Sequence, residues 1–198
     1  MKLSRAFLAG LIFVFLLLLV YYLHVAYFSV NVVFYAAIAD AVIATVLTGA
    51  LLFVLPYFRV FNPFEKILLA FIFLLLGYSF AISVPTVIDR SLSFYILEKI
   101  QQRGGGIRLN KFEEVFTKEY VKEHRLVDVR LTEQEESGTI SIHNGCVKIT
   151  DKGKRLAAFS RFFRQHFLPK KRLLMGQYTD DLTDPFRNSI QNSEYQCH

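Results

Sequence analysis

The sequence predicts a membrane protein in which three transmembrane helices precede a small soluble α+β domain. Between Ala6 and Phe58 the only formally charged side chain is Asp40, and residues 67–88 carry no charge at all. At Asp89 the composition changes abruptly, and charged residues are frequent from there on. Inside a bilayer the backbone must satisfy its own hydrogen bonds, so the uncharged stretches are expected to be helices.

The apolar part of the chain divides into three spans. A helix needs about 20 apolar residues to cross a hydrocarbon core, and stretches of that length lie at about 6–28, 32–55 and 67–88. Residues 1–90 are therefore expected to form the transmembrane domain. The first stretch is longer than the roughly 7–15 residues of a signal-peptide core, and no small-residue cleavage site follows it, so an uncleaved helix is expected.

A line of small side chains marks one side of the second span. Ala37, Ala41, Ala44 and Thr48 recur at helical spacing, and Asp40 lies beside them. Small residues let helix backbones approach closely within a bilayer, where packing drives association. The five residues are therefore predicted to form a membrane assembly face.

Asp40 has more than one interpretation. A charged carboxylate inside a span costs at least a few kcal/mol, and such residues face protein or water. The functional interpretation is a pairing site for a basic residue of a partner's membrane helix. The structural interpretation is a neutral Asp40, hydrogen-bonded to a backbone carbonyl or to Thr45 or Thr48. A proton or cation relay is a third, which the small size of a three-helix protein disfavours. His24 is assigned to the connection between the first two spans.

The charged half of the chain, from Asp89 on, contains sequence signals for several helices and one β-hairpin. Alternating residues on both sides of Asn144-Gly145 are a strong β-hairpin signal. Asn110 and Glu113 have the spacing of a helix capping box. The expected elements are helices at 91–102, 110–123 and 127–136, strands at 139–143 and 146–150, and a helix from Thr150 or Asp151 through 167.

This order resembles the winged helix-turn-helix family. Leu131 and the segment 135–140 resemble the end of the family's third helix entering its first wing strand, and 149–154 resembles the second wing strand running into the closing helix. The resemblance covers roughly 91–167. It implies a winged-helix-like domain, placed here at 91–172 with the basic aromatic helix at its end, and a polar tail at 173–198. Most members of the family bind DNA, and many are protein-interaction modules.

The expected third helix departs from the DNA-binding pattern. A helix that enters the major groove faces phosphates and needs basic side chains. The stretch 127–136 instead carries a single Arg130 against four acids, which are Asp128, Glu133, Glu135 and Glu136. A net charge of −3 argues against DNA binding, and the four acids are predicted to face a protein partner.

The expected last helix is basic and aromatic. Residues 152–172 hold eight bases and no acid, with phenylalanines interleaved among the cations. This composition is typical of a helix at a lipid surface, and it also suits an acidic partner or nucleic acid. The alternative is that Phe159 and Phe163 belong to the domain core above a solvated basic face. The cations predicted to contact lipid or an acidic partner are Arg155, Arg161, Arg164, Lys170, Lys171 and Arg172.

The basic segment also favours a cytoplasmic soluble domain, because the cytoplasmic leaflet is anionic. Charge counts around the spans do not decide the orientation. The cysteines, Cys146 and Cys197, and the five histidines show no metal-ligand spacing, and no catalytic motif is present. The sequence thus predicts no enzyme, cofactor or small-molecule substrate. It predicts an accessory or scaffold subunit of a larger membrane enzyme or transporter, with a membrane-tethered winged-helix transcription regulator as the alternative.

Overall fold

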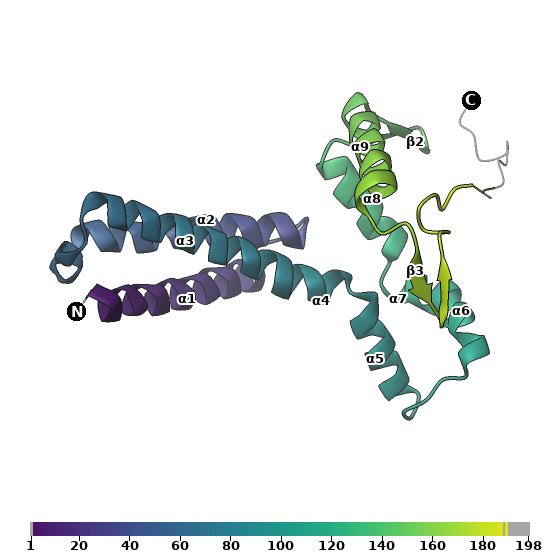
Figure 1. Cartoon of the computed structure of the whole chain (residues 1–198), viewed down its shortest axis with the longest axis horizontal. Coiled ribbons are helices and arrows are strands. Elements are labelled where there is room, and N and C mark those ends of the chain that lie inside the picture. The colour runs from purple at the N-terminus through teal and green to yellow at the C-terminus, as the bar shows by residue number, and fades with distance from the viewer. Residues whose placement is uncertain (1, 188, 190–198) are drawn as a thin grey trace. The chain divides into compact units, whose positions relative to one another are not determined.

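A computed structural model describes residues 2–187 and 189 of the 198-residue chain (Figure 1). The chain divides into two compact units, residues 1–120 and 121–198. The first unit holds three long helices and the short helical segments that follow them. The second holds two helices of more than ten residues and two β-hairpins. Polar tail residues 188 and 190–198, Cys197 among them, lie outside the described part of the chain.

Three helices of the first unit are long and apolar enough to cross a membrane, which confirms the prediction of three spans. The third is a continuous helical run that contains a π-helical turn. Their bounds are α1 at Lys2–Tyr27, α2 at Val33–Val54, α3 at Pro63–Ala81, the π-helical turn at Ile82–Thr86 and α4 at Val87–Arg90. Each span is within a few residues of its predicted position.

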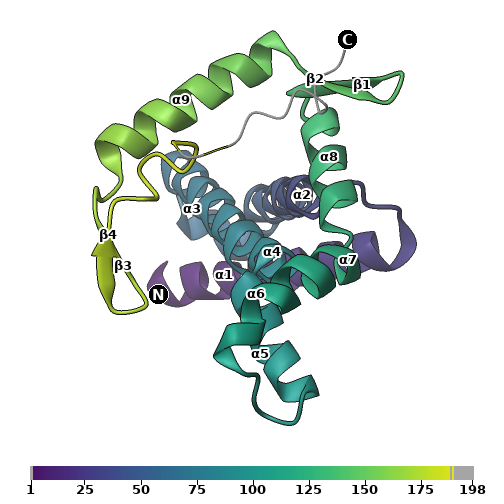
Figure 2. The same ribbon diagram turned by 90° about the vertical axis from the view of Figure 1, so that its right-hand side faces the viewer.

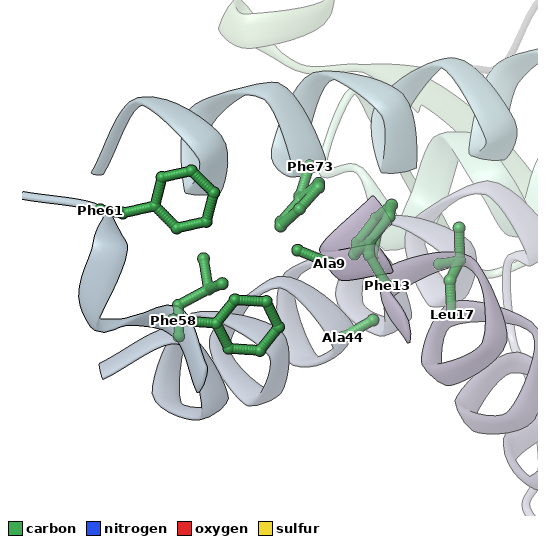
Figure 3. Close-up of a cluster of buried hydrophobic side chains, with 9 residues drawn as sticks. Ala9, Phe13, Leu17, Ala44, Phe58, Phe61 and Phe73 are labelled. Atoms are coloured by element: carbon green, nitrogen blue, oxygen red, sulfur yellow. The ribbon is translucent and has the colours of Figure 1, made fainter. Parts of the chain in front are cut away.

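Helix α2 packs against both α1 and α3. The interior contains stacked aromatic rings, with the centroids of Phe13 on α1 and Phe73 on α3 4.9 Å apart (Figure 3). Phe58 and Phe61 come from the connection between α2 and α3, and Figure 3 shows their rings turned into the same cluster. The connection therefore closes one end of the bundle with apolar side chains.

The start of α3 is strongly specified by its sequence. The Asn62 side chain accepts a hydrogen bond from the Glu65 backbone N–H, and the Glu65 side chain accepts one from the Asn62 backbone N–H. Pro63 occupies the first helical position, where its fixed φ suits the helix and its missing N–H loses nothing. Asn62-Pro63, expected as a turn between spans, is thus also a complete capping box.

The remainder of the first unit is a series of short helical segments. Helix α5, Leu92–Gln102, lies where a helix was expected, and the Ser91 hydroxyl caps it by accepting a hydrogen bond from the Phe94 N–H. The single helix expected at 110–123 is broken into a 3-10 turn at Leu109–Lys111, α6 at Phe112–Glu114, a π-helical segment at Val115–Tyr120 and, in the second unit, α7 at Val121–Glu123. The expected cap at Asn110 is wrong, because Asn110 lies within the 3-10 turn.

The second unit is built on the predicted hairpin (Figure 2). Strands β1, Ile140–His143, and β2, Cys146–Ile149, pair antiparallel, and both turn residues have positive φ, 52° at Asn144 and 74° at Gly145. These angles explain the Asn-Gly signal, since few other residues adopt them at low energy. Helix α8, Leu126–Glu136, precedes the hairpin.

Helix α9, Asp151–Phe167, follows the hairpin and begins as predicted. The Thr150 hydroxyl accepts a hydrogen bond from the Gly153 N–H and contacts the Thr139 carbonyl, which joins the helix start to the first strand. A second hairpin then follows, β3 at Arg172–Leu174 and β4 at Gln177–Thr179. It was not anticipated, and the expected polar tail therefore begins inside a strand.

Candidate functional site

The most unusual polar contact of the membrane unit joins α1 to α2. His24 Nδ1 lies 2.7 Å from Asp40 Oδ1. The Asp40 side chain is 1% exposed and the His24 side chain 29% exposed, so the pair reaches from the interior of the bundle toward its surface. Intramembrane ionisable residues that pair with one another commonly mark functional sites.

His24 was wrongly assigned to the connection, because α1 continues to Tyr27. The signal that could have found the pair is a histidine and an aspartate in two apolar helices on either side of one short connection. His24 lies four residues before the connection 28–32 and Asp40 eight residues after it, so both fall toward the same end of an antiparallel helix pair.

The hydroxyl groups considered for Asp40 have other partners. Thr45 donates to the Ala41 carbonyl and Thr48 donates to the Ala44 carbonyl, each at 2.8 Å. Such i to i−4 bonds satisfy a hydroxyl within its own helix. Within the chain, the partner of Asp40 Oδ1 is therefore neither of these threonines but the histidine of the first span.

The second carboxyl oxygen of Asp40 is buried, and no described residue hydrogen-bonds to it. Buried side-chain oxygens ordinarily have a partner. If one proton lies between His24 Nδ1 and Asp40 Oδ1 and a second is on His24 Nε2, the pair carries no net charge. An apolar surrounding favours such a neutral pair. Chemically, the arrangement can hold a proton at one defined depth of the bundle.

The predicted assembly face is covered within the chain itself. Helix α3 approaches it so closely that a Cβ atom added to Gly77 would lie 2.6 Å from the Ala41 Cβ. The face therefore packs against this chain's own helices. Its five members are each at most 2% exposed: Ala37, Asp40, Ala41, Ala44 and Thr48.

The acids of the predicted third helix lie on α8. Asp128 pairs with Arg125 at 2.9 Å, and Glu133 pairs with Arg130 at 2.7 Å. Glu135 is exposed near the end of the helix. Glu136, which follows it, is exposed too. None of the 11 residues of α8 is buried within the chain.

The cations of the predicted basic segment lie on α9 and on the segment that follows it. Only Gly153 is buried along α9. Phe159 is 60% exposed and Phe163 43% exposed, so the interpretation of these rings as domain core is wrong. Arg155, Arg161 and Arg164 lie on α9, Lys170 and Lys171 follow it, and Arg172 begins β3.

A cluster of ion pairs outside the spans was missed by the sequence analysis. Lys99 of α5, whose side chain is 6% exposed, contacts Glu119 at 2.7 Å, and Arg103 contacts the same carboxylate at 2.9 Å. The hydrogen bond from Lys99 is the main reason why the pKa of Glu119 lies below its ordinary value. Nearby, Lys118 and Lys111 lower the pKa of Glu114 to about 2.

Within the part of the chain that the structure describes, no group of three or more His, Cys, Asp or Glu side chains could hold a metal ion. The sequence matches no protein-family model, no curated protein and no solved structure. Three sites of this chain have features that suit a function: the His24–Asp40 pair, the surface of α8 and the surface of α9.

Proposed function

We propose that the chain is a non-catalytic membrane accessory or scaffold subunit that binds a larger membrane enzyme or transporter. The single observation that carries this proposal is α8, an 11-residue helix that buries none of its residues. Helices this short are marginal in water and owe most of their stability to packing of one face. A helix with no fully buried residue, whose half-buried positions are limited to Leu126, Arg130, Leu131 and Glu133, favours a second protein that covers its remaining surface.

The surface of α8 indicates what kind of partner suits it. Val127 is 58% exposed and Val129 38% exposed, which provides apolar area for burial. Glu135 and Glu136 add negative charge at the same helix. Exposed apolar residues beside charges of one sign are typical of interaction surfaces. The partner surface is therefore basic, as loops next to transmembrane helices commonly are on the cytoplasmic side.

The membrane bundle supports the proposal as an anchor. Its small-residue face is already packed against α1 and α3, so specific recognition falls to the soluble unit. A cytoplasmic location of that unit agrees with the eight bases of residues 152–172, which suit an anionic leaflet.

Charge reversal on α8 tests the proposal. The tagged full chain is purified from its native membranes in a mild detergent, as wild type and as Glu135→Lys. A membrane protein that co-purifies with the wild type is expected to be lost from the variant. The matched control is Glu98→Lys, the same change at an exposed residue of α5. Isolation of the wild-type chain with no co-purifying membrane protein would overturn the proposal.

The second candidate function is a membrane-tethered winged-helix transcription regulator. It is favoured by the sequence of elements α8, β1, β2 and α9, in which a hairpin stands between two helices. The acidic α8 stands against it, because phosphates repel that charge. Binding of duplex DNA by the full chain in detergent, weakening steeply as salt is raised, would favour the regulator over the subunit.

A further inference from the structure

We propose that α9 lies flat on an anionic bilayer surface, with its phenylalanine side chains inserted at the level of the lipid headgroups. The aromatic ladder is the set Phe159, Phe162, Phe163 and Phe167. This proposal does not rest on the proposed function, because it concerns a different helix and a lipid in place of a protein.

The aromatic ladder is one continuous surface. Along the helix, ring centroids are 6.0 Å apart for Phe159 and Phe163 and 5.3 Å apart for Phe163 and Phe167. Phe162 meets Phe167 at 5.9 Å. The four side chains are between 43% and 65% exposed. So much adjacent apolar area on one helix marks an interaction site.

The hairpin does not cover this ladder. The face of α9 that lines a cavity of about 280 Å³ with the hairpin is formed by Gly153, Leu156, Ala157 and Ser160. Packing there is close, since a Cβ atom at Gly153 would overlap the Thr139 carbonyl oxygen. The helix is therefore held at its beginning, and α9 continues past that contact to Phe167 (Figure 2).

Charge complementarity favours anionic lipid as the occupant. The segment 152–172 itself has eight bases and no acid, which gives it a strongly positive charge. An interfacial helix combines this charge with aromatic rings that reach the boundary of the acyl chains. At 17 residues and with five bases of its own, α9 is too short and too charged to span.

The same chain carries three helices that can cross a membrane. This favours lipid over an acidic protein or a nucleic acid as the partner of the aromatic ladder. A covalent link converts lipid binding by α9 into an intramolecular event with a high effective concentration. An acidic protein or a single-stranded nucleic acid gains no such advantage. The bilayer that holds the anchor is thus the favoured surface.

The experiment uses the absence of tryptophan from the sequence. Phe163→Trp gives the full chain one indole, at the centre of the aromatic ladder. The variant is reconstituted into nanodiscs of phosphatidylcholine alone, or of phosphatidylcholine and phosphatidylglycerol in equal parts, with brominated acyl chains as quencher. In the anionic nanodiscs the emission is expected to be blue-shifted, with quenching several-fold stronger than in the neutral ones.

Two further variants complete the test. Gln165→Trp places the indole on the opposite side of α9, two residues along, and is expected to give solvent-like, unquenched emission in both lipids. Phe167→Trp repeats the measurement at the end of the ladder, in case Phe163→Trp disturbs the helix. Absence of quenching at both Phe positions, or equal quenching in neutral and anionic nanodiscs, would overturn the proposal. So would a blue shift that needs an added acidic protein or RNA.

Discussion

His24 Nδ1 lies 2.7 Å from Asp40 Oδ1, and this contact connects the last turns of α1 to the first half of α2. The two helices are joined by a connection of only five residues, 28–32. His24 lies four residues before this connection and Asp40 eight residues after it, so their contact joins the two helices near the end of the bundle where they leave the turn. The buried carboxyl thus has a structural partner within the chain.

The first prediction concerns the energy of this contact. His24→Ala and Asp40→Ala are each expected to destabilise the bundle, since each leaves the other group in an apolar surrounding. In a double-mutant cycle the coupling energy is expected to be about 1 kcal/mol, the scale of hydrogen bonds between membrane helices. The measurement is unfolding of the full chain in mixed micelles as the fraction of denaturing detergent is raised.

The cycle has a control in the second unit. His166→Ala removes an imidazole that bonds the Phe162 carbonyl within its own helix. It is expected to leave the unfolding of the membrane bundle unchanged. A coupling energy near zero between His24 and Asp40 would show that their contact does not hold α1 against α2.

The second prediction concerns the approach of α3 to α2. Gly77→Ala places a methyl group 2.6 Å from the Ala41 Cβ, a distance that the two helices must relieve by moving apart. Overpacking of this kind costs about 1–3 kcal/mol. Ala41→Gly in the same chain removes the overlap and is expected to restore most of the loss. Micellar unfolding of the three variants measures both effects.

Gly49→Ala is the matched control, because nothing lies within 4 Å of a Cβ atom built at that position of α2. It is expected to be neutral or slightly stabilising. Equal destabilisation by Gly77→Ala and Gly49→Ala would point to a general intolerance of the helices to added methyl groups, and against close packing at Ala41.

The long elements were predictable because their signals are local. Uncharged stretches of membrane length are visible in the composition, and Asn144-Gly145 supplies the two positive φ angles of its turn. Contacts between elements were harder. Lys99 and Glu119 are twenty residues apart in the chain, across glycines and several short helical segments, so no periodicity relates them.

One sequence pattern appears twice and folds in two ways. Asn62-Pro-Phe-Glu65 forms a capping box, whereas Asn110-Lys-Phe-Glu113 does not. The difference lies in the residue after asparagine, because Pro63 fixes the backbone at the first helical position and Lys111 does not. After the glycines at 104–106 the chain enters a 3-10 turn instead, and the expected helix is interrupted.

The third prediction is a pH dependence outside the spans. The hydrogen bond from Lys99 lowers the pKa of Glu119 below its ordinary value of 4.5. The folded state therefore binds a proton less readily than the unfolded state does. The stabilisation is fully present above pH 4.5 and is lost as the pH falls through the lower, folded-state pKa.

A carboxyl NMR titration of the full chain in nanodiscs measures this shift. The resonance of Glu119 is expected to titrate below pH 4.5. In Lys99→Met, which removes the ammonium, the midpoint of Glu119 is expected to move upward. An unchanged midpoint in that variant would contradict the assignment of the shift to Lys99.

The last prediction concerns Gly153, which lets α9 start against the hairpin. A Cβ atom there would overlap the Thr139 carbonyl oxygen and lie 2.8 Å from Ile149 Cγ1. A backbone carbonyl in a hairpin cannot turn away as a flexible side chain can, so Gly153→Ala must push the helix off the strands. We expect a loss of about 1–3 kcal/mol or more, in spite of the better helix propensity of alanine.

Amide hydrogen exchange of the full chain in nanodiscs should then show faster exchange in β1, β2 and the first turn of α9, with α1–α3 unchanged. Gln165→Ala, an exposed change on the same helix, should leave every rate as it is, and unaltered hairpin protection in Gly153→Ala would mean that the helix start does not depend on this contact.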